Sequence, residues 1–262
     1  MESPQIKGKA VQRKESNPTK DQGHAFKCVP LSVNVIFEKC IKKDPQKMAI
    51  VEKLGFGSLQ YLPNDYLKHR VLMQLFKRFN TNYNTIHVVA GEVEITTEKI
   101  GKTFGLKYTG ITYPEKVTTK GLSEEDERIF KFFQSKSQAA LKELIFNTLI
   151  DSEANRDKFR RAFLLYIQKC FFLPISAPNV TPRALPTIFD LQNTRKKNWA
   201  LHIHNFLLEE IEKAKENNAS SVSGCCFALM VIYFYETHFG KNSQDVEARP
   251  SWIQYWTGET LW

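Results

Sequence analysis

The amino-acid sequence predicts a mainly α-helical fold, a multi-helix single domain with one small β-hairpin near residues 85–96. From Leu31 onward, apolar residues recur at helical spacing through most of the chain. Two β-branched runs around a glycine turn occur in the 85–96 stretch. The 262 residues are 42% hydrophobic and 12% aromatic, which is enough apolar material for one substantial core.

The chain is predicted to consist of a tail and one folded domain. Residues 1–27 are rich in Lys, Pro, Gln, Ser and Asn and have almost no large apolar side chains, so we expect a disordered basic tail. The domain is expected over 28–262. Within it, helices and the hairpin occupy 28–106, a linker rich in Thr and Gly occupies 107–121, and a helical part occupies 122–262.

The first half is predicted to begin with two short helices. Apolar residues between Leu31 and Leu54 recur at helical spacing on both sides of a proline, and Gly55 is a helix stop. A third helix is predicted after Asn64 or Asp65, either of which can cap it. Its apolar stripe is formed by Leu67, Val71, Leu72, Leu75, Phe76 and Phe79.

The hairpin and one further short helix complete the first half. The runs at 85–89 and 92–96 flank Gly91, a pattern typical of two strands joined by a tight turn. A helix over 98–104 is then expected to end at Gly105.

The second half is predicted to be entirely helical. Prolines punctuate its longest break, and Ser123 is followed by acidic residues that suit a helix N-terminus. In the first half, Thr96 or Thr97 is expected to cap the short helix over 98–104. Helices are predicted near 123–135, 137–150, 153–173, 184–191, 196–217 and 222–238.

Charge and cysteine content limit the class of protein. A formal net charge of +9 and a pI near 9.2 favour polyanionic partners: nucleic acid, an acidic protein or an anionic membrane face. The five cysteines are odd in number and follow no secretory segment, which predicts free thiols in a reducing compartment. No apolar stretch is long enough to cross a bilayer, so we expect no membrane partner.

Several short motifs follow a fixed order along the chain. They are Leu54-Gly55-Phe56-Gly57-Ser58-Leu59, the Leu72–Phe79 helix, Gly91-Glu92-Val93-Glu94-Ile95-Thr96, Phe104-Gly105-Leu106, Asn198-Trp199, and Ser223-Gly224-Cys225-Cys226. By this order and spacing, roughly residues 30–260 resemble the plant mobile domain. That family is also labelled aminotransferase-like, and it is similar to a domain of unknown function that accompanies ubiquitin-like-protease genes in plant Mutator-like transposons.

The resemblance implies a transposon-derived, uncharacterised protein that acts in the nucleus, or otherwise in the cytoplasm. It brings no catalytic residue, cofactor or metal ligand. No protease domain follows Trp262, so we expect either a stand-alone copy or the loss of the remainder. The resemblance assigns structural roles to Gly55, Phe56, Gly57, Gly91, Gly105, Asn198, Trp199, Gly224 and Cys225.

Candidate catalytic and cofactor sites have simpler structural explanations. The Gly55-Phe56-Gly57 turn lacks a phosphate-loop spacing, so a helix stop with a buried phenylalanine is favoured. His202 and His204 point about 200° apart on a helix and cannot share a metal; we expect one in the core or an interface and the other in water. Cys225-Cys226 is interpreted as packing, and no phosphate cup for an aminotransferase cofactor is visible.

The predicted function is therefore a non-enzymatic protein-interaction module with an unidentified protein partner. The C-terminal aromatics Trp252, Tyr255, Trp256 and Trp262 are a candidate contact, although we expect the first three to pack on the body. The alternative is a nucleic-acid-binding module that binds weakly and without sequence preference through its basic tail and basic helix starts.

The candidate residues of this alternative fall in the tail and on two helices, where the simpler explanation is a solvated helix face. They are Lys7, Lys9, Arg13, Lys14, Arg160, Arg161, Arg195, Lys196 and Lys197.

Overall fold

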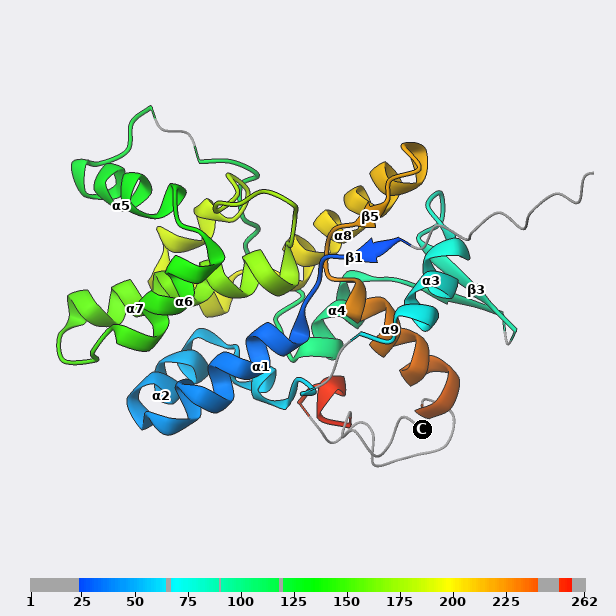
Figure 1. The fold of residues 1–262 in the computed structure, drawn as a ribbon, viewed down its shortest axis with the longest axis horizontal. Coiled ribbons are helices and arrows are strands. Elements are labelled where there is room, and N and C mark those ends of the chain that lie inside the picture. Colours follow the sequence, from blue (N-terminus) through cyan, green and yellow to red (C-terminus); the bar gives the residue numbers. More distant parts are fainter. Residues whose placement is uncertain (1–23, 65–66, 90, 118–119, 240–249, 256–262) are drawn as a thin grey trace, which may run out of the picture.

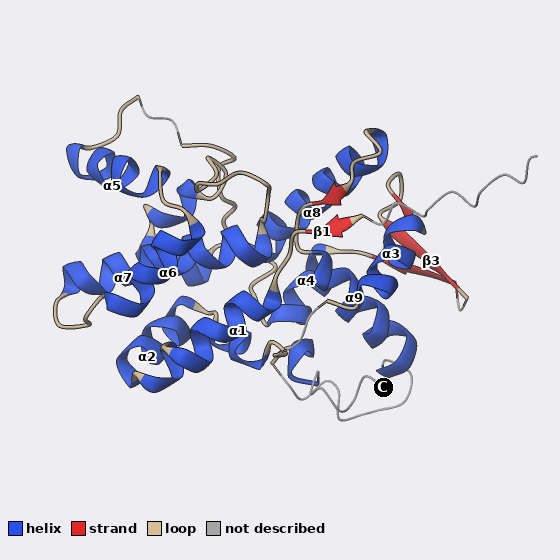
Figure 2. Ribbon diagram, viewed as in Figure 1, coloured by secondary structure: helices blue, strands red, loops and turns tan. Residues whose placement is uncertain are grey.

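A computed structural model of the chain describes residues 24–64, 67–89, 91–117, 120–239 and 250–255. Nine α-helices are present in these ranges: α1 (Pro30–Lys39), α2 (Pro45–Leu54), α3 (His69–Lys77), α4 (Thr97–Phe104), α5 (Glu124–Gln134), α6 (Gln138–Asn147), α7 (Glu153–Ile167), α8 (Trp199–Glu216) and α9 (Cys226–Phe234). The described strands are β1 (Ala25–Phe26), β2 (Phe79–Asn80), β3 (Thr85–Val88), β4 (Gly91–Glu94) and β5 (Ser221–Val222). The predicted mainly α-helical class is confirmed (Figure 2).

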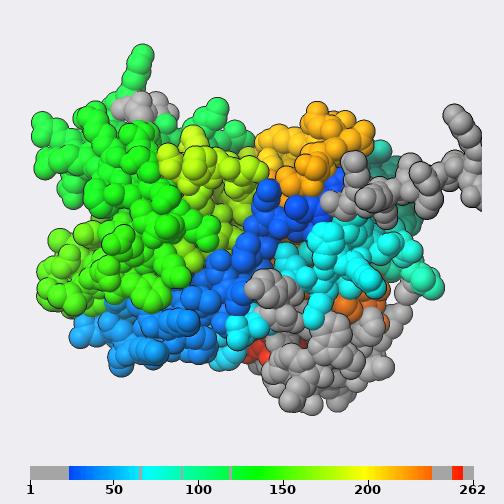
Figure 3. Space-filling model, in the orientation of Figure 1, coloured from blue at the N-terminus to red at the C-terminus, as the bar shows by residue number. Residues whose placement is uncertain are grey.

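The helices form two groups joined by α4 and α8. Helices α1 and α2 lie beside α6 and α7 at one end, with α5 on the far side of α6 and α7, whereas α3, α9 and the β2–β4 sheet lie at the other end (Figure 1). In the space-filling view the blue α1–α2 segment rests directly against the green α6–α7 segment (Figure 3). One apolar cluster runs through both groups, so the described residues share a single core.

Local capping explains most of the predicted helix ends. Asp44 accepts hydrogen bonds from the backbone N–H groups of Gln46 and Lys47 and starts α2, and Thr96 accepts from Lys99 N to start α4. Ser123 likewise accepts from Asp126 N at the start of α5. The caps at Thr96 and Ser123 were predicted because such contacts depend on residue type at fixed offsets, whereas the cap at Asp44 was not predicted.

The third helix starts later than expected. It begins at His69, and Lys68 at its N-cap position makes no side-chain hydrogen bond to the helix. Asn64 is therefore too far away to cap it, and Asp65 lies outside the described residues. Phe79, placed on the apolar stripe of this helix, instead belongs to β2.

The predicted hairpin is present and gains a third strand. Strands β3 and β4 are antiparallel, with Thr85 opposite Glu94 and Val88 opposite Gly91. Gly91 has a φ of +127°, a conformation that an L side chain rarely adopts. β2 adds to the other edge of β3, which makes a three-stranded sheet.

Three helix predictions in the second half are wrong in extent. The 184–191 segment forms 3-10 turns at Leu185–Ile188 and Leu191–Lys196, because Pro186 lies inside it. The helix predicted over 196–217 begins only at Trp199. By contrast, the helix predicted over 153–173 extends to Phe172, as an α-helix to Ile167 and as a π-helical turn after it.

The third of these helices, predicted over 222–238, follows an unexpected pair of strands. β1 pairs in parallel with β5, so Ala25 lies opposite Ser221 and Phe26 opposite Val222. The described chain thus begins at His24, inside the predicted tail, while residues 1–23 lie outside the described residues. Gly224 has a φ of +81° after β5, and α9 starts at Cys226 rather than at Val222.

The 107–121 linker and the C-terminal aromatics both pack on the body. The backbone of Ile111 accepts a hydrogen bond from Asn198 N at 2.8 Å, so the linker is docked against the start of α8. Trp252 is 7% exposed and stacks on Tyr235 at 3.7 Å between ring centroids. Tyr255 also packs against the core, and the other two tryptophans of this segment lie outside the described residues.

Across the described ranges, the helices include none both long and apolar enough to span a bilayer. The same ranges contain no group of three or more His, Cys, Asp or Glu side chains arranged to hold a metal ion.

Candidate anion-binding cleft

Two glycine turns bring distant parts of the chain together. Gly55 ends α2 and Gly105 ends α4, both in the left-handed conformation, with φ values of +93° and +65°. Leu106 N donates to the Gly101 carbonyl at 2.9 Å, which closes the second turn. Glycine adopts this conformation without a Cβ penalty, so both residues act as the predicted helix stops.

Beneath the two turns lies an aromatic junction, which consists of Phe56, Phe104, Phe172 and Trp199. The ring centroids of Phe56 and Trp199 are 4.9 Å apart, edge to face. Phe172 lies 6.3 Å from Phe56 and 5.3 Å from Phe104. All four side chains are buried, and the predicted insertion of Phe56 into the core is confirmed.

The start of α8 is fastened to the linker at the edge of this junction. The Asn198 side chain accepts from Leu201 N at 2.9 Å and donates to the Tyr108 carbonyl at 3.0 Å. Ala200 N donates to the Lys107 carbonyl at 3.1 Å. Asn198 is therefore both the N-cap of α8 and the anchor that holds residues 107–108 in place.

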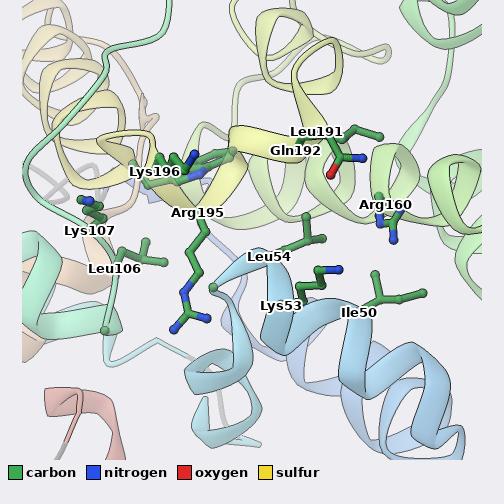
Figure 4. Close-up of a pocket in the computed structure, with 13 residues that line it drawn as sticks. Ile50, Lys53, Leu54, Leu106, Lys107, Arg160, Leu191, Gln192, Arg195 and Lys196 are labelled. Atoms are coloured by element: carbon green, nitrogen blue, oxygen red, sulfur yellow. The ribbon is translucent and has the colours of Figure 1, made fainter.

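Above the aromatic junction is a cleft of about 640 Å³. Aliphatic side chains line its walls: Ile50, Leu54, Leu106 and Leu191. Cationic side chains surround them: Lys53, Lys107, Arg160, Arg195 and Lys196 (Figure 4). Within the described part of the chain, no Asp or Glu lines the cleft.

Four of these cations form what we call the basic rim: Lys53, Lys107, Arg195 and Lys196. All four side chains belong to exposed residues. Among the residues that the structure describes, none of the four has a carboxylate partner within ion-pair distance. Arg195 is positioned by the first glycine turn, because its Cγ lies 3.5 Å from where a Cβ of residue 55 would be.

Arg160 lines the same cleft but is already neutralised. Its guanidinium is 2.5 Å from a carboxylate oxygen of Glu153 and 2.5 Å from one of Asp157. Burial opposes the charge of Arg160, but the hydrogen bonds to these two carboxylates outweigh burial and raise its pKa. Arg160 therefore contributes less positive potential to the cleft than the basic rim does.

The other predicted cations do not reach the cleft. Arg161 donates to the Ile188 carbonyl at 3.2 Å, and Lys197 pairs with Asp190 at 3.1 Å. The predicted cations of the tail are Lys7, Lys9, Arg13 and Lys14, and they lie outside the described residues. We expected solvated faces for Arg160 and Arg161, but their side chains are only 12% and 15% exposed, so that interpretation is wrong.

Two rim residues, Lys53 and Lys107, escaped the sequence analysis. Each stands next to a glycine turn, in the sequences Lys53-Leu54-Gly55 and Gly105-Leu106-Lys107. The second sequence reverses the order of residue types in the first, which is only a weak local indication that the two lysines belong to one site. It becomes informative only when the two turns are known to face one cleft.

An anion in the cleft would be held by side chains. The first backbone N–H groups of α8, from Trp199 to His202, all donate within the chain. The positive end of the helix dipole adds to the local potential, but its amides are not available as ligands. Lysine and arginine side chains from separate segments therefore provide the contacts.

The histidines and cysteines lie outside this cleft. Burial, and then the charge of Arg183, lowers the pKa of His202 to about 4. His204 was expected to face water if its neighbour faced the core. It is instead half-buried and bonded to the Ile95 carbonyl at 2.9 Å. Burial raises the pKa of the Cys225 and Cys226 thiols, which pack in the core.

Gly224 allows the segment that precedes α9 to pack closely against α8. A Cβ at Gly224 would lie 3.1 Å from the Leu207 Cα of α8. Gly57 is less constrained by its backbone, but a Cβ there would be 3.1 Å from the Glu52 side chain. The structural roles expected for these residues are thus packing roles.

Comparison with known proteins finds distant similarity to plant proteins. It is 25% identical over 236 residues to "Protein MAIN-LIKE 2" of Arabidopsis thaliana, covering 83% of this chain and 34% of that protein. It is 22% identical over 237 residues to "Protein MAINTENANCE OF MERISTEMS" of the same plant, covering 80% of this chain and 46% of that protein. The chain thus spans less than half the length of these relatives.

No solved structure matches the chain. The family model described as "Domain of unknown function (DUF8566)" matches residues 26–230. This match includes every residue of the basic rim and of the aromatic junction. Because it covers well over half of the sequence, the chain belongs to the DUF8566 family.

Proposed function

We propose that the chain is a non-enzymatic interaction module of the plant mobile domain type, derived from a transposon and acting in the nucleus. The basic cleft is where it holds its partner. The motif order described above and the distant similarity to the two Arabidopsis proteins support the assignment of type.

The observation that carries the proposal is the convergence of four cations that have no carboxylate partner among the described residues. Lys53 comes from α2, Lys107 from the linker, and Arg195 and Lys196 from the turn before α8. Bringing like charges together is unfavourable unless an opposite charge joins them. A cleft lined by one sign of charge also concentrates ligands of the other sign.

The same residues support a binding role over a catalytic one. Lysine and arginine side chains in the cleft can bind and orient an anion, but the described lining offers no carboxylate, histidine or thiol to transfer a proton or attack a substrate. The thiols of Cys225 and Cys226 are buried and have raised pKa values, so they are protonated at neutral pH.

A protein partner is the first candidate, because aliphatic residues make up much of the cleft wall. The test is capture from plant nuclear extract by the full chain and by Arg195→Glu/Lys196→Glu. Lys39→Glu/Lys43→Glu is the matched control, since both residues are exposed cations outside the cleft. We expect nuclease-resistant capture that only the cleft variant loses. Equal capture by all three proteins would exclude the cleft.

Nucleic acid is the second candidate, favoured because the cleft joins Arg160, Arg195 and Lys196, which the sequence predicted on separate helices. The test is a salt titration of fluorescent duplex and single strands with the full chain and with residues 24–262, which keep β1. We expect the basic tail to give weak, sequence-indifferent binding that the truncation abolishes, and the cleft alone to add none. Salt-resistant, sequence-selective binding by 24–262 would make nucleic acid the first candidate.

A further inference from the structure

The aliphatic walls and the arrangement of charges indicate which anionic partner fits the cleft. Resting on the proposed function, we propose that the cleft binds an acidic protein segment in which an aliphatic side chain lies between aspartate or glutamate residues. The aliphatic side chain packs between the walls, and the carboxylates contact the basic rim.

The walls favour an apolar anchor. Leu54 from α2 and Leu106 after α4 face the cleft from opposite sides, with Leu191 above them (Figure 4). The cleft has a volume of about 640 Å³, which lies in the range of ligand pockets that combine apolar walls with a few polar contacts. Leu54 and Leu106 are 5% and 6% exposed, and Leu191 is half-buried, so an aliphatic side chain would cover the small apolar surface that they present, which an inorganic anion would leave in water.

The spread of the cations favours several separated charges. Lys107 and Lys196 are drawn at one end of the cleft and Lys53 at the other, with Arg195 between them (Figure 4). A single phosphate group would engage one part of this arrangement. Carboxylates on both sides of an anchor residue would engage both ends.

The aromatic contacts of the cleft argue against a nucleic-acid strand. Recognition of single strands depends on exposed aromatic faces on which bases stack. In the described lining, the aromatic residue is Trp199, which is 1% exposed. Its ring is held against Phe56 at 4.9 Å and Tyr113 at 5.0 Å, so it offers no face to a base.

The experiment is fluorescence anisotropy with the full chain and a labelled peptide that carries one leucine with two aspartates on each side. Two control peptides change one feature each: aspartate to asparagine, and leucine to serine. A phosphoserine peptide with leucine and no aspartate, and a single-stranded oligonucleotide of equal charge, test the other sources of negative charge. The protein variants are Arg195→Glu/Lys196→Glu and Lys39→Glu/Lys43→Glu, each checked by thermal melting.

We expect the acidic peptide to bind, and both control peptides to bind at least about 10-fold more weakly, because one loses its charges and the other loses a buried leucine. Arg195→Glu/Lys196→Glu should lose at least about 10-fold in affinity, and Lys39→Glu/Lys43→Glu less than about threefold.

Equal binding of the leucine and serine peptides overturns this inference, as does tighter binding of the phosphoserine peptide or of the oligonucleotide. If the cleft variant then loses that other ligand, the proposed function stands with a different partner. If no anion distinguishes the cleft variant from the control variant, the proposed function fails as well.

Discussion

The aromatic junction and the basic rim occupy the same turns of the chain but follow different physical rules. Phe56 and Trp199 are fully enclosed, and each contacts several other rings. Lys53 and Arg195, a few residues away, are exposed and without carboxylate partners among the described residues. The junction is thus a packing feature that stabilises the fold, whereas the rim adds charge that the fold itself does not use.

Arg160 shows what distinguishes a structural cation from an available one. Glu153 and Asp157 lie seven and three residues before it on α7, so the helix itself supplies its carboxylates. Lys53 lies in the last turn of α2 and the other three rim cations lie on the linker or on a 3-10 turn, and none of the four has a carboxylate within ion-pair distance among the described residues. We therefore expect variants of the junction to change stability and variants of the rim to change binding.

The largest effect should follow from emptying the aromatic junction. Phe56→Ala removes a side chain that is 0% exposed, so it should lower the free energy of unfolding by about 3 to 5 kcal/mol. Chemical denaturation measures it. Tyr83→Ala is the control, because Tyr83 is 72% exposed and its loss should change stability by less than about 0.5 kcal/mol. Equal free energies of unfolding for the two variants would show that the Phe56 side chain does not contribute to the core.

A fall in pH should destabilise the fold next to the aromatic junction through His202, because the centroid of its ring lies 5.9 Å from that of Trp199. Its pKa is about 4 in the folded chain against a usual 6.5, so unfolding takes up a proton between these values. The neutral His202 side chain therefore contributes fully to the free energy of unfolding above about pH 6.5. As the pH falls toward 4, this contribution of up to roughly 3 kcal/mol is lost. Burial lowers the pKa of His204 too, which acts in the same direction.

The check is a series of urea denaturation curves between pH 7 and pH 4 for the parent and for His202→Gln. Glutamine cannot take up the proton, so the variant should show a shallower decline. Parallel declines would assign the acid sensitivity to other groups.

A smaller loss should follow at the turn between junction and rim. Gly105→Ala requires a φ of +65° and places a Cβ 2.9 Å from the Pro250 carbonyl oxygen. We expect a cost of about 1 to 3 kcal/mol. Gly121→Ala isolates the backbone part, because Gly121 has a φ of +88° with nothing within 4 Å of its Cβ position. Thermal melting should place Gly105→Ala below Gly121→Ala, and the reverse order would contradict the close contact.

The smallest change in stability is expected at the rim. Arg195→Glu/Lys196→Glu removes exposed cations that have no ion-pair partner among the described residues, so the free energy of unfolding should change by less than about 0.5 kcal/mol. The same variant should lose binding to its anionic partner. A loss of stability as large as that of Phe56→Ala would show that the rim residues belong to the core.

Much of the local structure could be read from the sequence because it depends on neighbours in the chain. The glycine stops at Gly55 and Gly105 and the cap at Ser123 follow from residue type and spacing, as does the hairpin around Gly91. The failures have a common cause. The 3-10 turns near Pro186 and the pairing of β1 with β5 depend on contacts that local periodicity does not contain.

The helical class, several helix ends and the excess of positive charge follow from the amino-acid sequence alone. Which cations are available for binding depends on how the helices pack in space. Arg161 and Lys197 are paired within the fold, while Lys53 and Lys107, which are 54 positions apart in the sequence, line the same cleft. The physical reason is that ion pairing depends on distances between side chains in space, whereas helix stops and caps depend on a few consecutive backbone angles.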